Sequence, residues 1–348
     1  ASGAGGSIRL DGQSIENFGR IEAKSGQGVK LSGTSQTRGS SGGRIALHAQ
    51  AEIHSGNVDV SGEWMSNPGS IFIGENYFAS SIDLDTGTLV FDTKSGCFFV
   101  EGGAHGEGVI TSTSFTHGIK DPWIFDVCTF TFTYVDIGPE VEVILRGDKP
   151  LVIQTVAGGN IVISSDFILD GENASSSDGY GGLGVLNPWN GRSSQALPGY
   201  GPGGPDATSF GGGNGASFNY NRDGKFLVPG SSGSSGSSFQ GSGAGGGAIK
   251  VIAAGDFILD GGSLISASGG IGRNDQDPSK PGGGGSGGAV HIFGHNIDNR
   301  GMIRVLGGNG GAEGGQVLLA ASNTLEQGNL SLGSGNLIEI NPPQFVPI

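Results

Sequence analysis

The chain repeats a pattern in which two adjacent glycines precede a run of alternating apolar and polar residues. A second alternating run follows in each copy, and in four of the five copies the first apolar residues of the two runs are 13 positions apart. Side chains alternate between the two faces of a β-strand, so each run predicts a short strand with one apolar face. The glycine pairs of the five copies occupy residues 5–6, 42–43, 246–247, 287–288 and 314–315.

The two runs of each copy predict which side chains form a core. In the first run we expect inward side chains at Ile8, Ile45, Ile249, Val290 and Val317, and in the second run at Ile21, Val58, Ile265, Ile303 and Leu330. The neighbouring positions of the first run would face outward, namely Arg9, Ala46, Lys250, His291 and Leu318. A middle element lies between the runs, with apolar residues at Ile15, Ile53, Phe257, Ile297 and Leu325. One copy cannot bury this apolar face alone, so the copies must stack on one another.

Three short strands per copy, separated by Gly, Asn, Asp and Ser, are typical of one coil of a parallel β-helix. We therefore predict an all-β fold, a right-handed parallel β-helix (β-solenoid) of about nine or ten coils with loop insertions along one edge. The glycines would suit the corners because glycine takes positive φ without steric cost. An antiparallel sandwich is the alternative, but it predicts hairpin turns at regular spacing, and the constant step within each copy favours coils.

The spacing between copies divides the chain into segments. Regular coils are expected at 1–61 and 246–340, irregular coils or an independent β-subdomain at 62–157, a single coil at 158–171 and an extended tail at 341–348. A glycine-, serine- and aromatic-rich insertion occupies residues 172–245 and follows the first of two DFILDG copies. Its aromatic content predicts that part of it folds against the coils, whereas residues 231–238 are expected to be flexible.

Composition narrows the functional classes. The chain has 348 residues, 72 of them glycine, with a net charge of −14. This acidic balance argues against a nucleic-acid partner, which needs clustered Lys and Arg. No apolar run approaches the ~20 residues that span a bilayer, and no signal peptide is recognisable. Because Ala1 already stands at the edge of a repeat, we expect a processed chain or a fragment.

The pattern Gly-Gly-x-Ile-x-Ile, with a middle Ile-x-Asx or Leu-x-Gly and a final Gly-x-Ile-x-Ala/Val-x-Gly-Gly, resembles a known class of repeats. It is similar to the glycine-rich right-handed parallel β-helix regions of very large secreted surface proteins, the haemagglutinin-like adhesins. The resemblance covers residues 1–61 and 158–332. It implies an extracellular or cell-surface location and a structural or adhesive role, and it carries no catalytic residues to transfer.

Two cysteines and two asparagines are candidates for covalent modification. Cys97 and Cys128 are 31 residues apart, close to the length of one coil. Stacked coils bring equivalent positions about 4.8 Å apart, so a disulfide is a hypothesis, and two buried free thiols are the alternative. Asn173 and Asn329 each begin an Asn-x-Ser sequence that matches the N-glycosylation acceptor, and Asn173 is the better candidate because it lies in the insertion.

The sequence offers little for metal binding or catalysis. Oxygen ligands for Ca²⁺ could come from residues 274–277 or from Asp83 and Asp85, but neither has the spacing of a calcium loop, and a solvated acidic turn is the alternative. No HExxH or CxxC motif occurs. Many parallel β-helices degrade polysaccharides with convergent carboxylates, yet no acidic pair recurs here at the spacing of adjacent coils. We therefore assign no catalytic, cofactor-binding or metal-binding residue.

Together these observations predict a non-catalytic extracellular structural protein, a rigid rod or a subunit of a filament or surface appendage that can also be adhesive. The alternative is a carbohydrate-binding or polysaccharide-degrading β-helix protein, because the aromatics of residues 172–245 could stack on sugars instead of forming a small satellite core. Expected partners are further copies or repeats of the same kind, glycans and other surface proteins. No cofactor is expected.

Overall fold

The computed structural model describes residues 7–12, 15–16, 20–23, 44–49, 53–54, 57–59 and 70–75, and then 81–100, 105–115, 123–156, 158–175, 183–188, 190–191, 199, 201–202, 204–205, 227–236, 240–273, 281–308 and 312–340. Every regular element in these residues is a β-strand. The chain divides into two compact units, residues 1–78 and 79–348. We describe each unit separately.

The described residues of the first unit form three sets of parallel strands. The strands β1 (Ser7–Gly12), β4 (Arg44–Ala49) and β7 (Ser70–Glu75) pair in that order. The shorter strands β2 (Ile15–Glu16) and β5 (Ile53–His54) pair with each other, as do β3 (Arg20–Glu22) and β6 (Asn57–Asp59). The register places Ile8 opposite Ile45 and Ile21 opposite Val58, so the 13-residue step aligns both runs at once.

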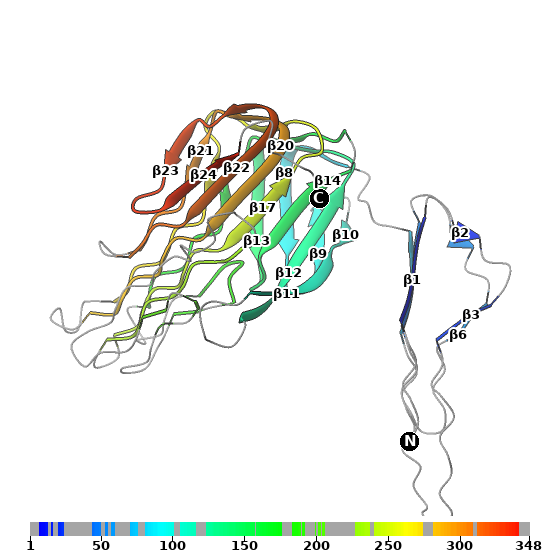
Figure 1. Ribbon diagram of the computed structural model, residues 1–348, viewed down its shortest axis with the longest axis horizontal. Coiled ribbons are helices and arrows are strands. Elements are labelled where there is room, and N and C mark those ends of the chain that lie inside the picture. Colours follow the sequence, from blue (N-terminus) through cyan, green and yellow to red (C-terminus); the bar gives the residue numbers. More distant parts are fainter. Residues whose placement is uncertain are drawn as a thin grey trace, which may run out of the picture. The chain divides into compact units, whose positions relative to one another are not determined.

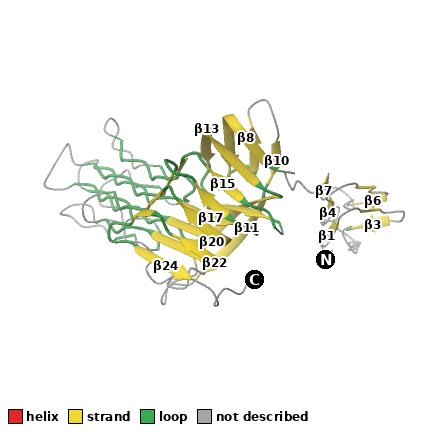
Figure 2. Ribbon diagram, turned by 90° about the horizontal axis from the view of Figure 1, so that it is seen from above, coloured by secondary structure: helices red, strands yellow, loops and turns green. Residues whose placement is uncertain are grey.

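The second unit contains a sheet of 13 strands that is mostly parallel and nearly closes on itself (Figures 1 and 2). One row of parallel strands, here the first ladder, runs through β12 (Trp123–Phe132), β14 (Leu151–Thr155), β17 (Ala248–Ile252), β20 (Ala289–Asn299), β22 (Gln316–Glu326) and β24 (Asn336–Ile340). Each strand of this ladder pairs in parallel with the next, although the chain between them passes through other strands.

Two further ladders belong to this unit. The second ladder contains β8 (Ile82–Asp92), β13 (Val135–Arg146), β15 (Ile161–Ile163), β18 (Phe257–Leu259) and the carboxyl-terminal halves of β20 and β22. The third is a separate four-stranded sheet of β16 (Phe167–Ile168), β19 (Leu264–Ser266), β21 (Met302–Arg304) and β23 (Asn329–Ser331). The first two ladders form one sheet because β20 and β22 run through both without a break.

The predicted core is confirmed in this unit. Ile249, Val290 and Val317 lie opposite one another in the first ladder and are fully buried. Ile265 and Ile303 do the same in the third ladder. Stacking equal residues in register removes each apolar side chain from water, which contributes about 1.5–3 kcal/mol for a side chain of this size. The prediction of an all-β fold is therefore confirmed, and strand positions follow from the apolar alternation.

The other end of this unit departs from the repeat. The strands β9 (Cys97–Val100), β10 (His105–Glu107) and β11 (Val109–Phe115) pair antiparallel, β9 with β8 and β10, and β11 with β12. Under them the core is aromatic, with the rings of Phe91 and Phe130 centred 5.2 Å apart. Among the described residues of this unit, the antiparallel pairs therefore all lie within residues 82–132, and the other strand pairs are parallel.

The glycine pairs stack directly on one another. The amide of Gln316 donates to the carbonyl of Gly288 (2.8 Å), and that of Ala289 donates to Gly247 (3.1 Å). A Cβ on Gly288 would approach the carbonyl oxygen of Gly247 within 3.0 Å, closer than real Cβ atoms come. Neither glycine is among those with a left-handed backbone. The expectation of positive φ at these corners is wrong, because what requires glycine is the close approach of adjacent turns.

Glycine-rich segments beside the ladders form a bundle without regular strands, here called the glycine bundle and defined as residues 227–236, 240–247, 267–273 and 281–288 (green in Figure 2). Its hydrogen bonds recur at every third residue. Gly282, Gly285 and Gly288 donate to Arg273, Gly270 and Ala267 at 2.7, 2.9 and 2.7 Å. In the same way, Gly230, Gly233 and Gly236 donate to Gly246, Gly243 and Gln240. A period of three is that of an extended left-handed helix of the polyproline II type, whereas a strand would have a period of two.

This geometry lets one segment bond to several neighbours. Residues 241–247 bond to the segments around Gly230, Gly270 and Gly283. A strand has partners on two sides only, so the bundle could not be built from flat strands. The expectation that residues 231–238 are flexible is wrong for the described residues 231–236, which are buried. Their small side chains let the backbones approach closely enough to bond to one another.

Candidate functional site

A pocket of about 490 Å³ lies at the corner where the first ladder ends and the second begins. It is lined by Thr133, Tyr134, Val135, Asp136, Val156, Gly158, Gly159, Asn160 and Val162. Its size falls in the range of about 300–1,000 Å³ usual for small-ligand sites. An aromatic ring, a carboxylate, an amide and a hydroxyl thus meet in one hollow, which we take as the candidate site.

A tight glycine turn shapes one wall of the pocket. Gly158 has a φ of 79°, a left-handed value that favours glycine. A Cβ on Gly159 would lie within 3.0 Å of the carbonyl oxygen of Thr133, so a side chain cannot be accommodated there. The hydroxyl of Thr155 donates to the carbonyl of Gly159 (2.7 Å) and accepts from the amide of Ala254 (2.9 Å), which ties the turn to the residues that follow β17.

Polar side chains continue from the pocket along the same corner. Asn160 accepts a hydrogen bond from the amide of Asp256 through Oδ1 (2.8 Å), and Asn296 donates to the Asp256 carboxylate (2.7 Å). Asn323 and Thr324 then donate to Asn296 at 2.8 and 2.7 Å. This row fixes the amide of Asn160, because its oxygen is held on the side of Asp256.

Two aspartates face outward beside the pocket. Asp136 on β13 lies opposite Asp83 on β8, one step along the second ladder. The hydroxyl of Tyr134 donates to Oδ2 of Asp83 (3.1 Å), while its ring is 40% exposed. Burial raises the pKa of Asp136, and the neighbouring carboxylates of Asp83, Asp85 and Asp260 raise it further. Among the described residues no cation forms an ion pair with Asp83, Asp85 or Asp136.

The sequence analysis missed this site. It expected no acidic pair at the spacing of adjacent coils, and that expectation is wrong, because Asp136 lies opposite Asp83 and Asp298 lies opposite Glu326. Asp83 and Asp136 belong to the irregular segment 62–157, where no glycine pair marks the register. The usable signal was local: an apolar-Asp-apolar triplet recurs as Ile82 to Leu84 and as Val135 to Ile137, and each triplet starts a second-ladder segment.

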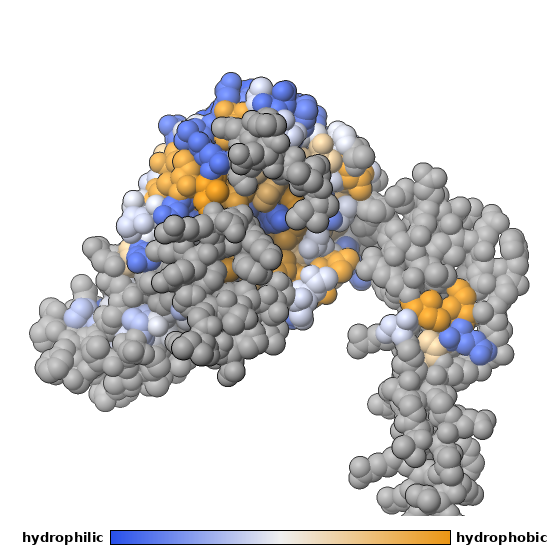
Figure 3. All heavy atoms as spheres, viewed as in Figure 1, coloured by the Kyte–Doolittle hydropathy of each residue, from blue (hydrophilic) through white to orange (hydrophobic). Residues whose placement is uncertain are grey.

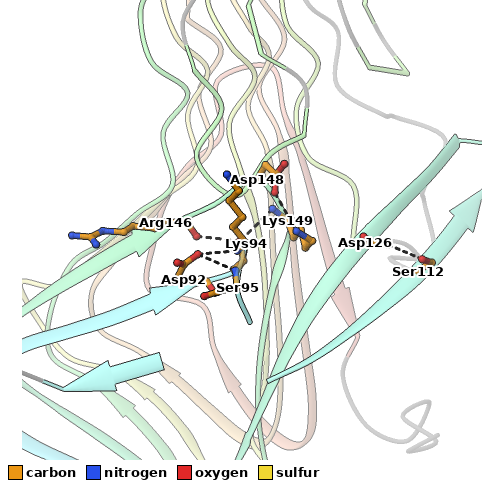
Figure 4. A network of polar contacts seen from close by, with 9 residues as sticks. Asp92, Lys94, Ser95, Ser112, Asp126, Arg146, Asp148 and Lys149 are labelled. Atoms are coloured by element: carbon orange, nitrogen blue, oxygen red, sulfur yellow. Dashed lines mark hydrogen bonds and ion pairs between the residues drawn. The ribbon is translucent and has the colours of Figure 1, made fainter. Parts of the chain in front are cut away.

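Cys97 and Cys128 are free thiols in this structure, and a disulfide between them stays a prediction. Cys97 is on the antiparallel strand β9 and Cys128 on β12, so they do not occupy equivalent positions of stacked coils. Burial raises the pKa of Cys128 to about 12, which disfavours the reactive thiolate. Near them, Asp92 accepts from the amides of Lys94 and Ser95 and closes the turn between β8 and β9 (Figure 4).

The two glycosylation candidates are both exposed. Asn173 accepts a hydrogen bond from the amide of Ile271 (2.7 Å) through Oδ1, the atom that glycosylation leaves in place. Asn329 begins the short strand β23, which pairs on one side with β21. Both modifications stay predictions, and the structure adds that a modification at Asn173 would lie beside the contact with residues 267–273.

The calcium and sugar-stacking candidates stay predictions. Residues 274–277 lie outside the described part of the chain, as do the eight aromatics of the insertion. Asp83 and Asp85 are exposed on β8. No group of three or more His, Cys, Asp or Glu side chains that could hold a metal ion exists in the described residues. Within the same residues no helix has the length and apolarity to cross a membrane.

The side chains predicted to face outward from the first ladder do lie opposite one another, but they are not all exposed to solvent. Lys250, His291 and Leu318 lie opposite one another, yet His291 and Leu318 are 1% exposed. The same face packs against Leu227 of the glycine bundle through Val152, Ala248 and Ala289. Hydrophilic side chains gather instead along the upper edge of this unit in Figure 3, where Figure 1 places the turns around β20, β21 and β23.

Comparison of the chain with protein-family models, with curated proteins and with solved structures finds no match. The functional argument therefore rests on the geometry described above.

Proposed function

We propose that this chain is a non-catalytic structural protein of the extracellular space or cell surface, built as a right-handed parallel β-helix that forms a rigid rod or a filament subunit. The observation that carries the proposal is the in-register stacking of three ladders over a continuous apolar core. A right-handed crossover is the hand that parallel strands adopt in nearly all known connections.

Apolar side chains of the first ladder are less buried in β24 than in the middle of the ladder, which supports the filament part of the proposal. Ile249, Val290 and Val317 are fully buried in the middle of the first ladder, whereas Leu337 in β24 is only half-buried. β24 pairs with β22 on one side, and the described residues place no strand on its other side. An open edge of this kind can accept a further strand, from more repeats or from a second copy.

Negative-stain electron microscopy of the intact secreted protein, combined with sedimentation over a range of concentrations, tests the proposal. We expect elongated particles and an association that grows with concentration. Compact, globular particles at all concentrations would contradict the rod and filament together.

Carbohydrate binding or degradation is the second candidate, and the pocket beside Asp83 and Asp136 favours it. Two carboxylates on adjacent strands are the groups that glycoside hydrolysis needs, and different surroundings can separate their pKa values. Depolymerisation assays on acidic and neutral glycans test it. Release of reducing ends that is lost in Asp136→Asn would establish an enzyme and contradict the non-catalytic proposal.

A further inference from the structure

We infer that the pocket at Tyr134, Asp136 and Asn160 binds an amino sugar that carries a protonated amine. The inference goes beyond the rod, and it gives the second candidate function, carbohydrate binding, a ligand class. It rests on the proposed rod only for its biological setting, because binding of a soluble sugar can fail while the rod persists, and the reverse also holds.

The negative charge beside the pocket favours a ligand that carries a positive charge. Asp136 has Asp83 on the neighbouring strand, and Asp85 and Asp260 act on it from nearby. Arg300 pairs with Asp298 and with Asp260, so it offsets part of the charge of Asp260, but it forms no ion pair with Asp83, Asp85 or Asp136. Asp83, Asp85 and Asp136 have no cationic partner among the described residues, and neighbouring carboxylates of this kind are stabilised when a ligand brings an ammonium group between them.

The other side chains that line the pocket favour binding of a sugar ring. The ring of Tyr134 is 40% exposed, and its hydroxyl is anchored on Asp83, so a flat apolar face is presented in a fixed position. An ammonium group over or beside that ring also gains a cation–π attraction. Asn160 has its oxygen engaged by Asp256, which leaves its amide NH₂ as a donor, and the hydroxyl of Thr133 is a second group for sugar hydroxyls.

The pocket is also preformed. Gly158 and Gly159 remove the side chains that would fill it, and Thr155 locks their turn to the following coil. A site that does not have to reorganise loses less affinity on binding. Among the described residues, the carboxylates near the pocket do not belong to any group of three or more His, Cys, Asp or Glu side chains that could hold a metal ion.

Isothermal titration calorimetry of the full chain tests the inference with three probes: the fully deacetylated glucosamine tetrasaccharide, its N-acetylated counterpart and tetralysine. We expect the deacetylated sugar to bind, and the N-acetylated sugar and tetralysine each to bind at least about tenfold more weakly. Equal binding of tetralysine would show that charge alone acts and would overturn the sugar. Equal binding of the N-acetylated sugar would overturn the role of the amine.

Variants locate the site. Asp136→Asn should weaken binding of the deacetylated sugar by about tenfold or more, and Tyr134→Ala by a similar factor. The matched control is Glu142→Gln, which neutralises another exposed carboxylate on β13 and should leave binding unchanged. Because Asp136 is exposed and surrounded by carboxylates, Asp136→Asn should fold normally, as thermal unfolding will show. Unchanged affinity in a folded Asp136→Asn protein, or no binding of any probe, would overturn the inference.

Discussion

The ladders and the glycine bundle order their backbones by opposite means. In the ladders, large side chains such as Ile249 and Val290 fill the interior, and their burial holds the strands in register. In the bundle, most residues are glycine or serine, and the backbones of residues 241–247 and 282–288 come close enough to bond to each other directly. Hydrophobic alternation therefore reports only one of the two ordered regions of this unit.

The comparison shows that a glycine-rich composition does not by itself mean a flexible chain. A free glycine segment loses more conformational entropy on ordering than any other segment. Many hydrogen bonds and packing contacts must therefore offset this entropic cost in the bundle. Asn187 provides several of them, since its buried amide donates to the carbonyls of Gly230, Gly245 and Gly246 at 2.9, 2.9 and 3.0 Å. One side chain thus joins two segments of the bundle.

The largest loss of stability is expected in the ladders, where buried side chains hold the strands together. Ile249→Ala should lower the free energy of unfolding by about 2–5 kcal/mol, because the fully buried side chain leaves a cavity between β14 and β20. Urea unfolding followed by circular dichroism measures the change. Ile168→Ala is the control, since Ile168 is 43% exposed and its removal should cost far less. Equal losses in the two variants would contradict the core assignment.

The junction between the two regions predicts a dependence on pH. Burial lowers the pKa of His291 to about 4, and Lys250 lowers it further, while the hydrogen bond to Gln316 (3.1 Å) opposes this shift. Since the unfolded histidine titrates near pH 6.5, the unfolded state binds the proton first and stability falls as the pH drops from about 6.5 to 4. The full loss is on the order of 3 kcal/mol.

His291→Gln keeps a partner for Gln316 without a titrating group. Unfolding measured between pH 4 and 7 should therefore show a shallower decline in this variant than in the natural protein. Parallel declines would show that His291 is not buried in the neutral form, and that the outward face of the first ladder is open to water.

A smaller loss of stability is expected at the glycine pairs, where the lack of a side chain lets adjacent backbones pack closely. Gly288→Ala should destabilise by about 1–3 kcal/mol, because its Cβ would collide with the backbone of the preceding turn. Gly261→Ala is the matched control, since the nearest atom to its Cβ would be 4.0 Å away. If both alanines have the same effect on thermal unfolding, the close approach of the glycine pairs is not what requires glycine.

The sequence predicts the ladders well because their signal is periodic. The alternation around Ile249 and Ile303 identified buried positions, and the 13-residue step aligned strands that are far apart in the chain. It predicts the glycine bundle poorly, because a period of three in backbone hydrogen bonds leaves no trace in hydropathy when most residues are Gly and Ser. The corner pocket was missed for another reason: Tyr134 and Asp83 meet only once β8 and β13 are paired.

Amide hydrogen exchange tests the central claim most directly. If the glycine bundle is ordered by its own hydrogen bonds, peptides that cover Gly243, Gly246 and Gly285 should exchange as slowly as peptides from β17 and β20. Exchange of the bundle at the rate of an unfolded chain, with β17 and β20 still protected, would contradict the account and return these segments to the class of flexible linkers.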